Sequence, residues 1–328
     1  PMMDFVDNFP PQLIYYTEDK QTFLDEAWLT FDWHTDVIGS IKKNFNPSVV
    51  IHDIYTPNQM LTSRWWMGYL DKNSSNYGKV SEVERTQLWS EVNEMYQRLD
   101  KMIGEIMDNA DEDTYIVLSS DHGAVPLERW VNLNNFFAQK GWLKFTINQE
   151  TGEPVIDWEN STVIYLKMAH VYINPSGLAG NYQRSSGDDY EQLREEVRQA
   201  LIALEDSNGA KPVVEVVNWE DAQEFMNLDP TRVGDLVIAN KPGYGWNEEM
   251  TADKALFSQP LKTGYKQAID PNVKGMWTPF IIAGPGIKED NYLGEKPITH
   301  IDQYPTIMHA LEKEIPDFVQ GKQIQIFK

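Results

Sequence analysis

The sequence predicts an α/β fold with a mainly parallel central sheet flanked by helices. Segments with helical periodicity alternate along the chain with short, continuous apolar runs, and such runs are typical of strands buried in a parallel sheet. One long helical segment is followed by an apolar strand that ends in a polar cluster at 119–123 (SSDHG), as expected at the carboxyl edge of an open sheet. The 328 residues are 41% hydrophobic, so a large core can form.

The N-terminal part combines helical and extended patterns. Weak helical periodicity from Phe23 to Ile41 predicts a helix with irregular chain before it, within residues 1–45. The β-branched run from Ser48 to Tyr55 (SVVIHDIY) predicts a buried strand. Residues 56–71 have no such periodicity and are expected to form a loop.

The clearest element is a helix that begins near residue 81. Ser81 and Glu84 match a capping box, and apolar residues follow at helical spacing as far as Ile106. An acidic turn at 108–114 ends the helix, and residues 115–119 (YIVLS) form the next apolar strand.

The remaining elements continue the alternation of strands and helices. Strands are expected at 162–167, 171–174, 213–217, 235–239 and 279–283, and helices at 190–204 and 300–311. We interpret residues 1–328 as one α/β domain that carries an inserted subdomain at about 125–260.

Charge and composition exclude several kinds of partner. The chain has 28 Lys and Arg against 50 Asp and Glu, a formal charge of −22, which disfavours binding to nucleic acid or an anionic membrane. A phosphate-bearing substrate would therefore need a local cation, such as a metal ion. No apolar run is long enough for a membrane span, and without cysteine there is no thiolate metal site. The cell compartment, cytoplasmic or secreted, is left open.

Asp121 and His122 are the first candidate ligands. A carboxylate and an imidazole side by side at the end of a strand suit one divalent ion, and the following Gly123 lets the backbone approach closely. The alternative is a turn whose histidine is satisfied by ordinary hydrogen bonds.

Three ordered segments carry a resemblance to a known family. They are YIVLSSDHGAVPLERWVNLNNFFAQKGWL at 115–143, MWTPFIIAGPGIK at 276–288 and ITHIDQYPTIMHALEKEIPDFVQGKQI at 298–324. Over about residues 71–328 the chain resembles the type I phosphodiesterase / nucleotide pyrophosphatase family of the alkaline phosphatase superfamily. The resemblance implies an alkaline-phosphatase-like fold and metal-dependent hydrolysis of a small phosphate ester.

The resemblance also assigns metal ligands, residue by residue. Asp121 and His122 match the family's Asp-His-Gly cluster, which supplies half of one metal site. The family's second site includes an Asp-x-x-x-His segment before a helix. Asp71 matches that aspartate, but Ser75 stands where the histidine is expected. Asp53 is a competing candidate that lies farther ahead of the helix.

Lys266 replaces the family's last imidazole, because Gly264-Tyr265-Lys266 falls where Gly-x-His is expected. An ammonium group has no lone pair for a metal, so we expect one divalent ion, zinc or similar, rather than two. Lys266 could supply the missing positive charge to a phosphate, pair with Asp71, or mark a decayed site; the alignment itself could also be shifted.

The nucleophile is not assigned. The family uses a Ser or Thr on a strand-to-helix turn ahead of the aligned segments, and Thr62-Ser63 lies too late in the chain to match it. We expect that residue outside this sequence, for example on a separate N-terminal chain segment. The competing functions are a non-catalytic family member that acts as a structural or binding protein, and a relative similar to sulfatases or phosphomutases.

Overall fold

The protein is described by a computed structural model that covers residues 19–175, 183–261, 263–265, 273–289 and 297–328. The fold is mixed α/β with several sheets, which agrees with the predicted class. The chain forms two compact units. The first unit contains residues 1–60, 86–123 and 275–328, and the second contains 61–85 and 124–274.

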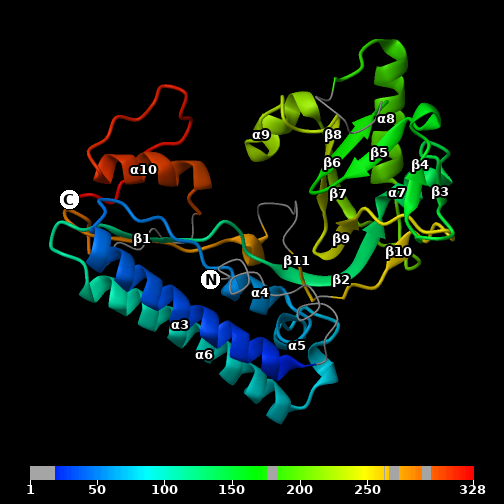
Figure 1. The fold of residues 1–328 in the computed structure, drawn as a ribbon. Coiled ribbons are helices and arrows are strands. Elements are labelled where there is room, and N and C mark those ends of the chain that lie inside the picture. Colours follow the sequence, from blue (N-terminus) through cyan, green and yellow to red (C-terminus); the bar gives the residue numbers. More distant parts are fainter. Residues whose placement is uncertain (1–18, 176–182, 262, 266–272, 290–296) are drawn as a thin grey trace. The chain divides into compact units, whose positions relative to one another are not determined.

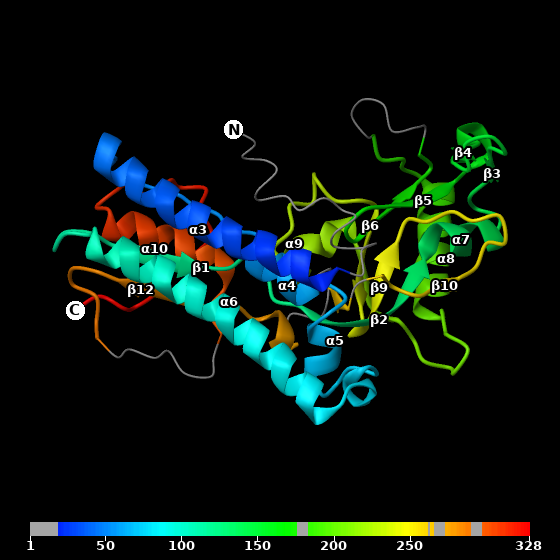
Figure 2. The same cartoon turned by 60° about the horizontal axis from the view of Figure 1, so that its bottom comes forward.

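Two long helices, α3 (Lys20–Phe45) and α6 (Glu82–Asp108), dominate the first unit and run side by side in Figures 1 and 2. The Asp19 side chain caps α3 by accepting from the Thr22 amide, which satisfies one of the open N–H groups of the first turn. An ion pair between Lys20 and Glu91, at 2.7 Å, joins the two helices. Apolar side chains are buried on both helices: Phe23, Leu24, Ala27 and Phe31 on α3, and Leu88, Val92, Met95 and Met102 on α6.

The predicted capping box of α6 is confirmed. The Ser81 amide donates to Glu84 Oε2 at 2.8 Å, and the Glu84 amide donates back to Ser81 Oγ at 3.2 Å. Each side chain thereby satisfies a backbone donor that has no partner inside the helix.

Strand β1 (Ile116–Ser119) does not form the parallel pairing that was expected of the central sheet. It pairs antiparallel with β12 (Phe280–Ala283), with Ser119 opposite Phe280. The parallel central sheet is therefore not confirmed; among the described residues the parallel pairing is between β2 and β9 of the second unit. The first unit also contains the short helix η5 (His300–Asp302), which leads into α10 (Gln303–Ala310).

The prediction of a strand at 48–55 is wrong. Residues 46–55 are irregular, and the side chains of Val49, Val50 and Ile51 are exposed. A strand requires a neighbouring strand for its hydrogen bonds, and none in the described parts of the chain pairs with this segment. The loop expected at 56–71 instead contains two short helices, α4 (Thr56–Thr62) and α5 (Met67–Leu70).

The second unit is built from three sheets and several short helices. One sheet has the antiparallel order β5-β6-β8-β7; another joins β10, β2 and β11, with β9 on β2; and β3 and β4 form a hairpin. The strands are β2 (Val125–Asn132), β3 (Phe145–Ile147), β4 (Pro154–Ile156), β5 (Val163–Leu166), β6 (His170–Ile173), β7 (Val213–Asn218), β8 (Leu236–Asn240), β9 (Gly243–Asn247), β10 (Phe257–Ser258) and β11 (Gly264–Tyr265). The helices are α7 (Leu133–Gln139), α8 (Asp188–Ile202) and α9 (Ala222–Met226), with short 3-10 turns η1 (Tyr77–Lys79), η2 (Trp158–Asn160) and η3 (Trp219–Asp221). A further turn, η4 (Lys274–Met276), follows at the boundary with the first unit.

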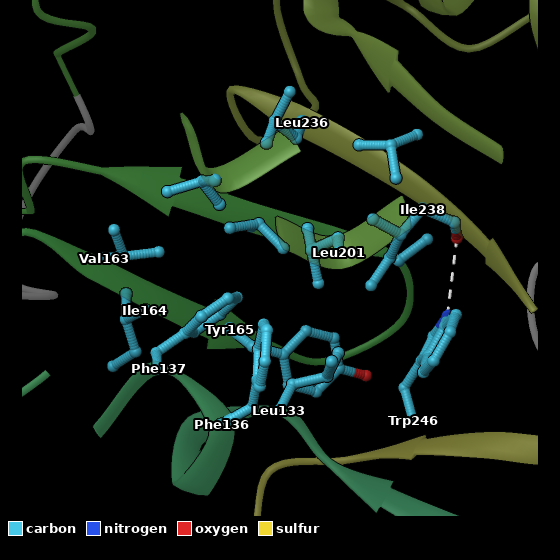
Figure 3. Close-up of a cluster of buried hydrophobic side chains, with 14 of the residues drawn as sticks. Leu133, Phe136, Phe137, Val163, Ile164, Tyr165, Leu201, Leu236, Ile238 and Trp246 are labelled. Atoms are coloured by element: carbon cyan, nitrogen blue, oxygen red, sulfur yellow. Dashed lines mark hydrogen bonds between the residues drawn. The ribbon is translucent and has the colours of Figure 1, made fainter. Parts of the chain in front are cut away.

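The main apolar core lies in the second unit and is shown in Figure 3. Helices α7 and α8 pack on the sheet of β5, β6 and β8, where Phe137, Leu201 and Ile238 have no exposed surface. The Trp246 indole donates to the Ile238 carbonyl at 3.4 Å, so its polar edge has a partner inside the core. Each such side chain contributes about 1.5–3 kcal/mol through burial.

Two expectations about organisation have different outcomes. In the described part of the chain, every helix is too short or too polar to cross a lipid bilayer. The inserted subdomain at 125–260 stays a prediction, although most of that range falls within the second unit.

Candidate metal centre

The candidate centre begins where β1 ends. The four residues of β1 lead directly into Ser120, Asp121 and His122, and the chain then passes close to the segment before β12. The Gly123 amide donates to the Met276 carbonyl at 3.0 Å. A Cβ atom on Gly123 would lie 2.7 Å from Met276 Cα, so this approach requires glycine.

The hydrogen bond of His122 fixes its tautomer. His122 Nδ1 lies 2.9 Å from the Gly123 carbonyl oxygen, and because a carbonyl can only accept, Nδ1 carries the proton. In the neutral ring Nε2 then keeps its lone pair. Metal-binding histidines commonly have this arrangement, with one nitrogen donating to a carbonyl and the other facing the ion.

The free nitrogen of His122 faces the neighbouring carboxylate. His122 Nε2 and Asp121 Oδ2 are 3.5 Å apart. Ligand atoms at about 2.0–2.1 Å from a tetrahedral ion are separated by roughly 3.3–3.4 Å, so the observed spacing fits two ligands of one ion. The Asp121 side chain is 86% exposed and that of His122 21% exposed, which leaves the carboxylate open to solvent.

The pair is half of a complete coordination set. A structural or catalytic zinc site takes three or four protein ligands, and among the residues described here no group of three His, Cys, Asp or Glu side chains is placed to hold an ion. Asp121 and His122 can therefore supply two ligands of a metal ion, and the other coordination positions of that ion are not assigned to residues.

Two residues near the pair were not singled out from the sequence. Thr278 Oγ1 lies 2.9 Å from the Ser120 carbonyl oxygen and 3.3 Å from His300 Nε2. His300 therefore lies beside the segment that carries Asp121. The predicted strand at 279–283 and the segments at 276–288 and 298–324 that carry the family resemblance pointed to this region, but none of them marked Thr278 or His300 as a functional residue.

Asp71 and Ser75 belong to the second unit and lie in one turn. Asp71 ends α5, and its Oδ1 accepts from the Asn73 amide at 2.8 Å. Ser75 is bonded to Glu128: its amide donates to Oε1 at 3.0 Å, and its hydroxyl donates to Oε2. Glu128 was not predicted from the sequence, because it belongs to no recognisable motif. It lies on β2, 53 residues after Ser75, and the fold brings the two together.

The other predicted site residues have separate outcomes. Asp53 is exposed in the irregular segment before α4. Lys266 lies outside the described residues. That Asp71, rather than Asp53, approaches Asp121 as part of the second half of the site stays a prediction, as does the role of Lys266.

Comparison with known proteins then decides the family. The family model for type I phosphodiesterase / nucleotide pyrophosphatase matches residues 41–263, which is more than half of the chain. The chain belongs to this family. The matched segment contains Asp71, Ser75, Asp121, His122 and Glu128, whereas Thr278 and His300 lie beyond it.

The chain is also similar to solved structures. Human ectonucleotide pyrophosphatase / phosphodiesterase 5 is 16% identical, with a TM-score of 0.44, over 90% of this chain and 60% of that chain. Phosphonoacetate hydrolase from Sinorhizobium meliloti 1021, in complexes with phosphonoformate and with phosphonoacetate, is 15% identical, with a TM-score of 0.40, over 81% of this chain and 54% of that chain. The chain thus spans little more than half the length of these proteins. No protein with a curated description matches it.

Proposed function

We propose that this chain carries the ion-binding pair of a metal-dependent phosphoester hydrolase that acts on a small phosphate ester. Membership of the type I phosphodiesterase / nucleotide pyrophosphatase family supports the reaction class. The observation that carries the proposal is the 3.5 Å spacing of Asp121 Oδ2 and His122 Nε2, combined with the hydrogen bond that puts the proton of the neutral ring on Nδ1.

A bound divalent ion, zinc or similar, would supply a Lewis acid that stabilises negative charge on the phosphoryl oxygens. Asp121 contributes a negative charge and a hard oxygen to the ion, and His122 contributes a neutral nitrogen. The Gly123 carbonyl keeps His122 in the tautomer that can bind. The nucleophile is not assigned to a residue of this chain, and the proposal assigns it no step.

The second half of the site is proposed to be modified. An imidazole in place of Ser75 would be a zinc ligand, but the Ser75 hydroxyl is instead engaged by the Glu128 carboxylate. We assign Lys266 the role of a fixed positive charge that faces the substrate phosphate, with Asp71 as its partner, so one ion rather than two is held.

Metal binding to the whole chain tests this function. We expect about one equivalent of Zn²⁺ by calorimetry and by elemental analysis, and loss of that equivalent in Asp121→Asn and in His122→Gln. Asp317→Asn changes a similarly exposed carboxylate and should leave binding intact. Hydrolysis of a chromogenic phosphodiester, assayed in a protein that also supplies the nucleophile, should depend on the ion. Wild-type protein that binds no ion, or an Asp121→Asn variant that binds as well as wild type, would refute the proposal.

A second candidate is a non-catalytic family member that acts as a binding or structural protein. The engagement of Ser75 by Glu128 favours it, because this position offers no imidazole. Retention of the Asp121 and His122 pair opposes it. Stoichiometric ion binding without any turnover of phosphomonoesters or phosphodiesters, in a protein that also supplies the nucleophile, would favour this candidate over the hydrolase.

A further inference from the structure

The Thr278 hydroxyl connects two groups of the first unit that are far apart in sequence. Its oxygen lies 2.9 Å from the Ser120 carbonyl oxygen on one side and 3.3 Å from His300 Nε2 on the other. Thr278 precedes β12, Ser120 follows β1, and His300 begins η5. Three separate segments therefore meet at one hydroxyl group.

The chemistry of the three groups fixes the direction of both hydrogen bonds. A threonine hydroxyl has a single proton, and a carbonyl oxygen can only accept. Thr278 therefore donates its proton to Ser120, and its oxygen must accept from His300. This requires a proton on His300 Nε2, so the chain of donors runs from His300 through Thr278 to the Ser120 carbonyl.

The accepting carbonyl belongs to the peptide bond that joins Ser120 to Asp121. The orientation of this peptide bond sets the direction in which the Asp121 side chain points away from the backbone. On the other side of His122, the Gly123 amide is held by the Met276 carbonyl at 3.0 Å. The dipeptide Asp121-His122 is thus fixed at both ends by the segment before β12, while the Asp121 carboxylate itself remains exposed.

The far end of this chain is also anchored. Thr299 Oγ1, next to His300, donates to Asp302 Oδ2 at 2.7 Å, and the Lys322 amide donates to Asp302 Oδ1 at 2.8 Å. Buried Thr306 adds a hydrogen bond from its hydroxyl to the Asp302 carbonyl. The turn that presents His300 is therefore held in place by several bonds, and a donor on such a turn is pre-oriented toward Thr278.

We propose that Thr278 and His300 are positioning residues of the metal centre: their hydrogen-bond chain orients the Ser120–Asp121 peptide so that Asp121 Oδ2 and His122 Nε2 face one ion. The effect on ion binding rests on the function proposed above. Hydrogen bonds in series reinforce one another, and residues that orient metal ligands typically change metal affinity by about 10-fold to 100-fold when they are lost.

Matched variants of the 328-residue chain test this role by the affinity for Zn²⁺, measured by competition with a chelating dye. Thr278→Val keeps the shape of the side chain but removes both hydrogen bonds, and His300→Leu removes only the second. We expect Zn²⁺ to bind about 10-fold more weakly to Thr278→Val than to wild type. The loss of affinity in His300→Leu should be smaller. Thr278→Ser and His300→Gln, which keep a hydroxyl and a donor, should retain most of the affinity.

The double variant distinguishes a relay from two independent structural roles. Because His300 acts through Thr278, adding His300→Leu to Thr278→Val should cause no further loss of affinity, whereas independent effects would add. The visible spectrum of the Co²⁺ form should change in Thr278→Val, because it reports the geometry around the ion. Unchanged Zn²⁺ affinity in Thr278→Val, or additive losses in the double variant, would overturn the proposal.

A readout without metal separates this proposal from the proposed function. In the metal-free protein, long-range ¹⁵N–¹H correlation should show the Nε2–H tautomer for His300, and Thr278→Val should shift the Ser120 ¹³C carbonyl resonance. If wild type binds no ion but both signals behave as stated, the proposed hydrolase function is refuted, whereas the orientation of Asp121 by the hydrogen bonds of His300 and Thr278 stands. If His300 is in the Nδ1–H form, the chain does not exist and the inference fails by itself.

Discussion

The Glu128 carboxylate accepts hydrogen bonds from both the amide and the hydroxyl of Ser75. Ser74 adds a third bond from its hydroxyl, at 3.3 Å. One carboxylate on β2 thus holds the turn that follows Asp71.

We predict that Glu128→Gln loosens this turn. An amide has one acceptor oxygen instead of two and places a donor opposite the Ser75 hydroxyl, so the free energy of unfolding should fall by about 1–3 kcal/mol. Denaturant unfolding measures this, and hydrogen exchange at the Ser75 amide should become faster. Glu153→Gln changes an exposed glutamate on the second unit and is the control. Equal stability of the two variants would mean that Glu128 does not hold the turn.

The two halves of the proposed site predict a gain of function. Replacing both Ser75 and Lys266 by histidine should restore two imidazoles and allow a second divalent ion to bind. An ammonium group has no lone pair, and a neutral hydroxyl is not among the usual zinc ligands, whereas neutral imidazole is. Calorimetry with Zn²⁺ counts the ions per chain. Each single variant should still bind one ion. If the double variant also binds one, these two residues do not occupy the places of the family ligands.

We predict opposite effects on stability for Gly123→Ala and Gly104→Ala. Gly123→Ala would place a Cβ 2.7 Å from Met276 Cα, so the segment must move, and both Tm and the Zn²⁺ affinity should fall. Gly104→Ala, near the C-terminal end of α6, meets no atom within 4 Å and should stabilise the helix by up to about 1 kcal/mol. Thermal unfolding of both variants checks the contrast, which fails if Gly123→Ala is as stable as wild type.

Asp206 predicts a dependence of stability on pH. Hydrogen bonds from the Ala210 amide, above all, and from the Tyr244 hydroxyl lower the pKa of Asp206 below its usual value, and Arg129 contacts the same carboxylate at 2.9 Å. A lowered pKa in the folded state stabilises the fold above the unfolded pKa of about 3.9. This contribution is lost as the pH falls through the folded pKa.

Asp206→Asn should therefore destabilise the protein at pH 7, and the difference from wild type should shrink below about pH 4. Urea unfolding at several pH values measures this difference. Asp113→Asn, at an exposed carboxylate, is the control. A difference that is the same at pH 7 and pH 3 would show that the charge of Asp206 is not what matters.

Local signals in the sequence identified much of the fold. The capping box of Ser81 and Glu84 located the start of α6, and apolar runs located β1 and β12, because these features depend on residues close together in the chain. The polar cluster at 119–123 was likewise recognised at the end of its strand. Each of these predictions needed only the order of residues.

Features that depend on distant partners were not predictable. The antiparallel pairing of β1 with β12, the bond between Ser75 and Glu128, and the chain from His300 through Thr278 each join segments separated by many residues. The run from Ser48 to Tyr55 shows that a local signal alone can also mislead. Its strand propensity is strong, but propensity without a neighbouring strand does not form a sheet.

That irregular segment has a consequence for how the protein behaves in solution. Val49, Val50 and Ile51 are 58%, 46% and 90% exposed, and an exposed, contiguous β-branched stretch favours association between molecules. The formal charge of −22 opposes that contact by mutual repulsion between chains. Colloidal stability should therefore depend on ionic strength, because salt screens the repulsion without weakening the attraction between apolar segments.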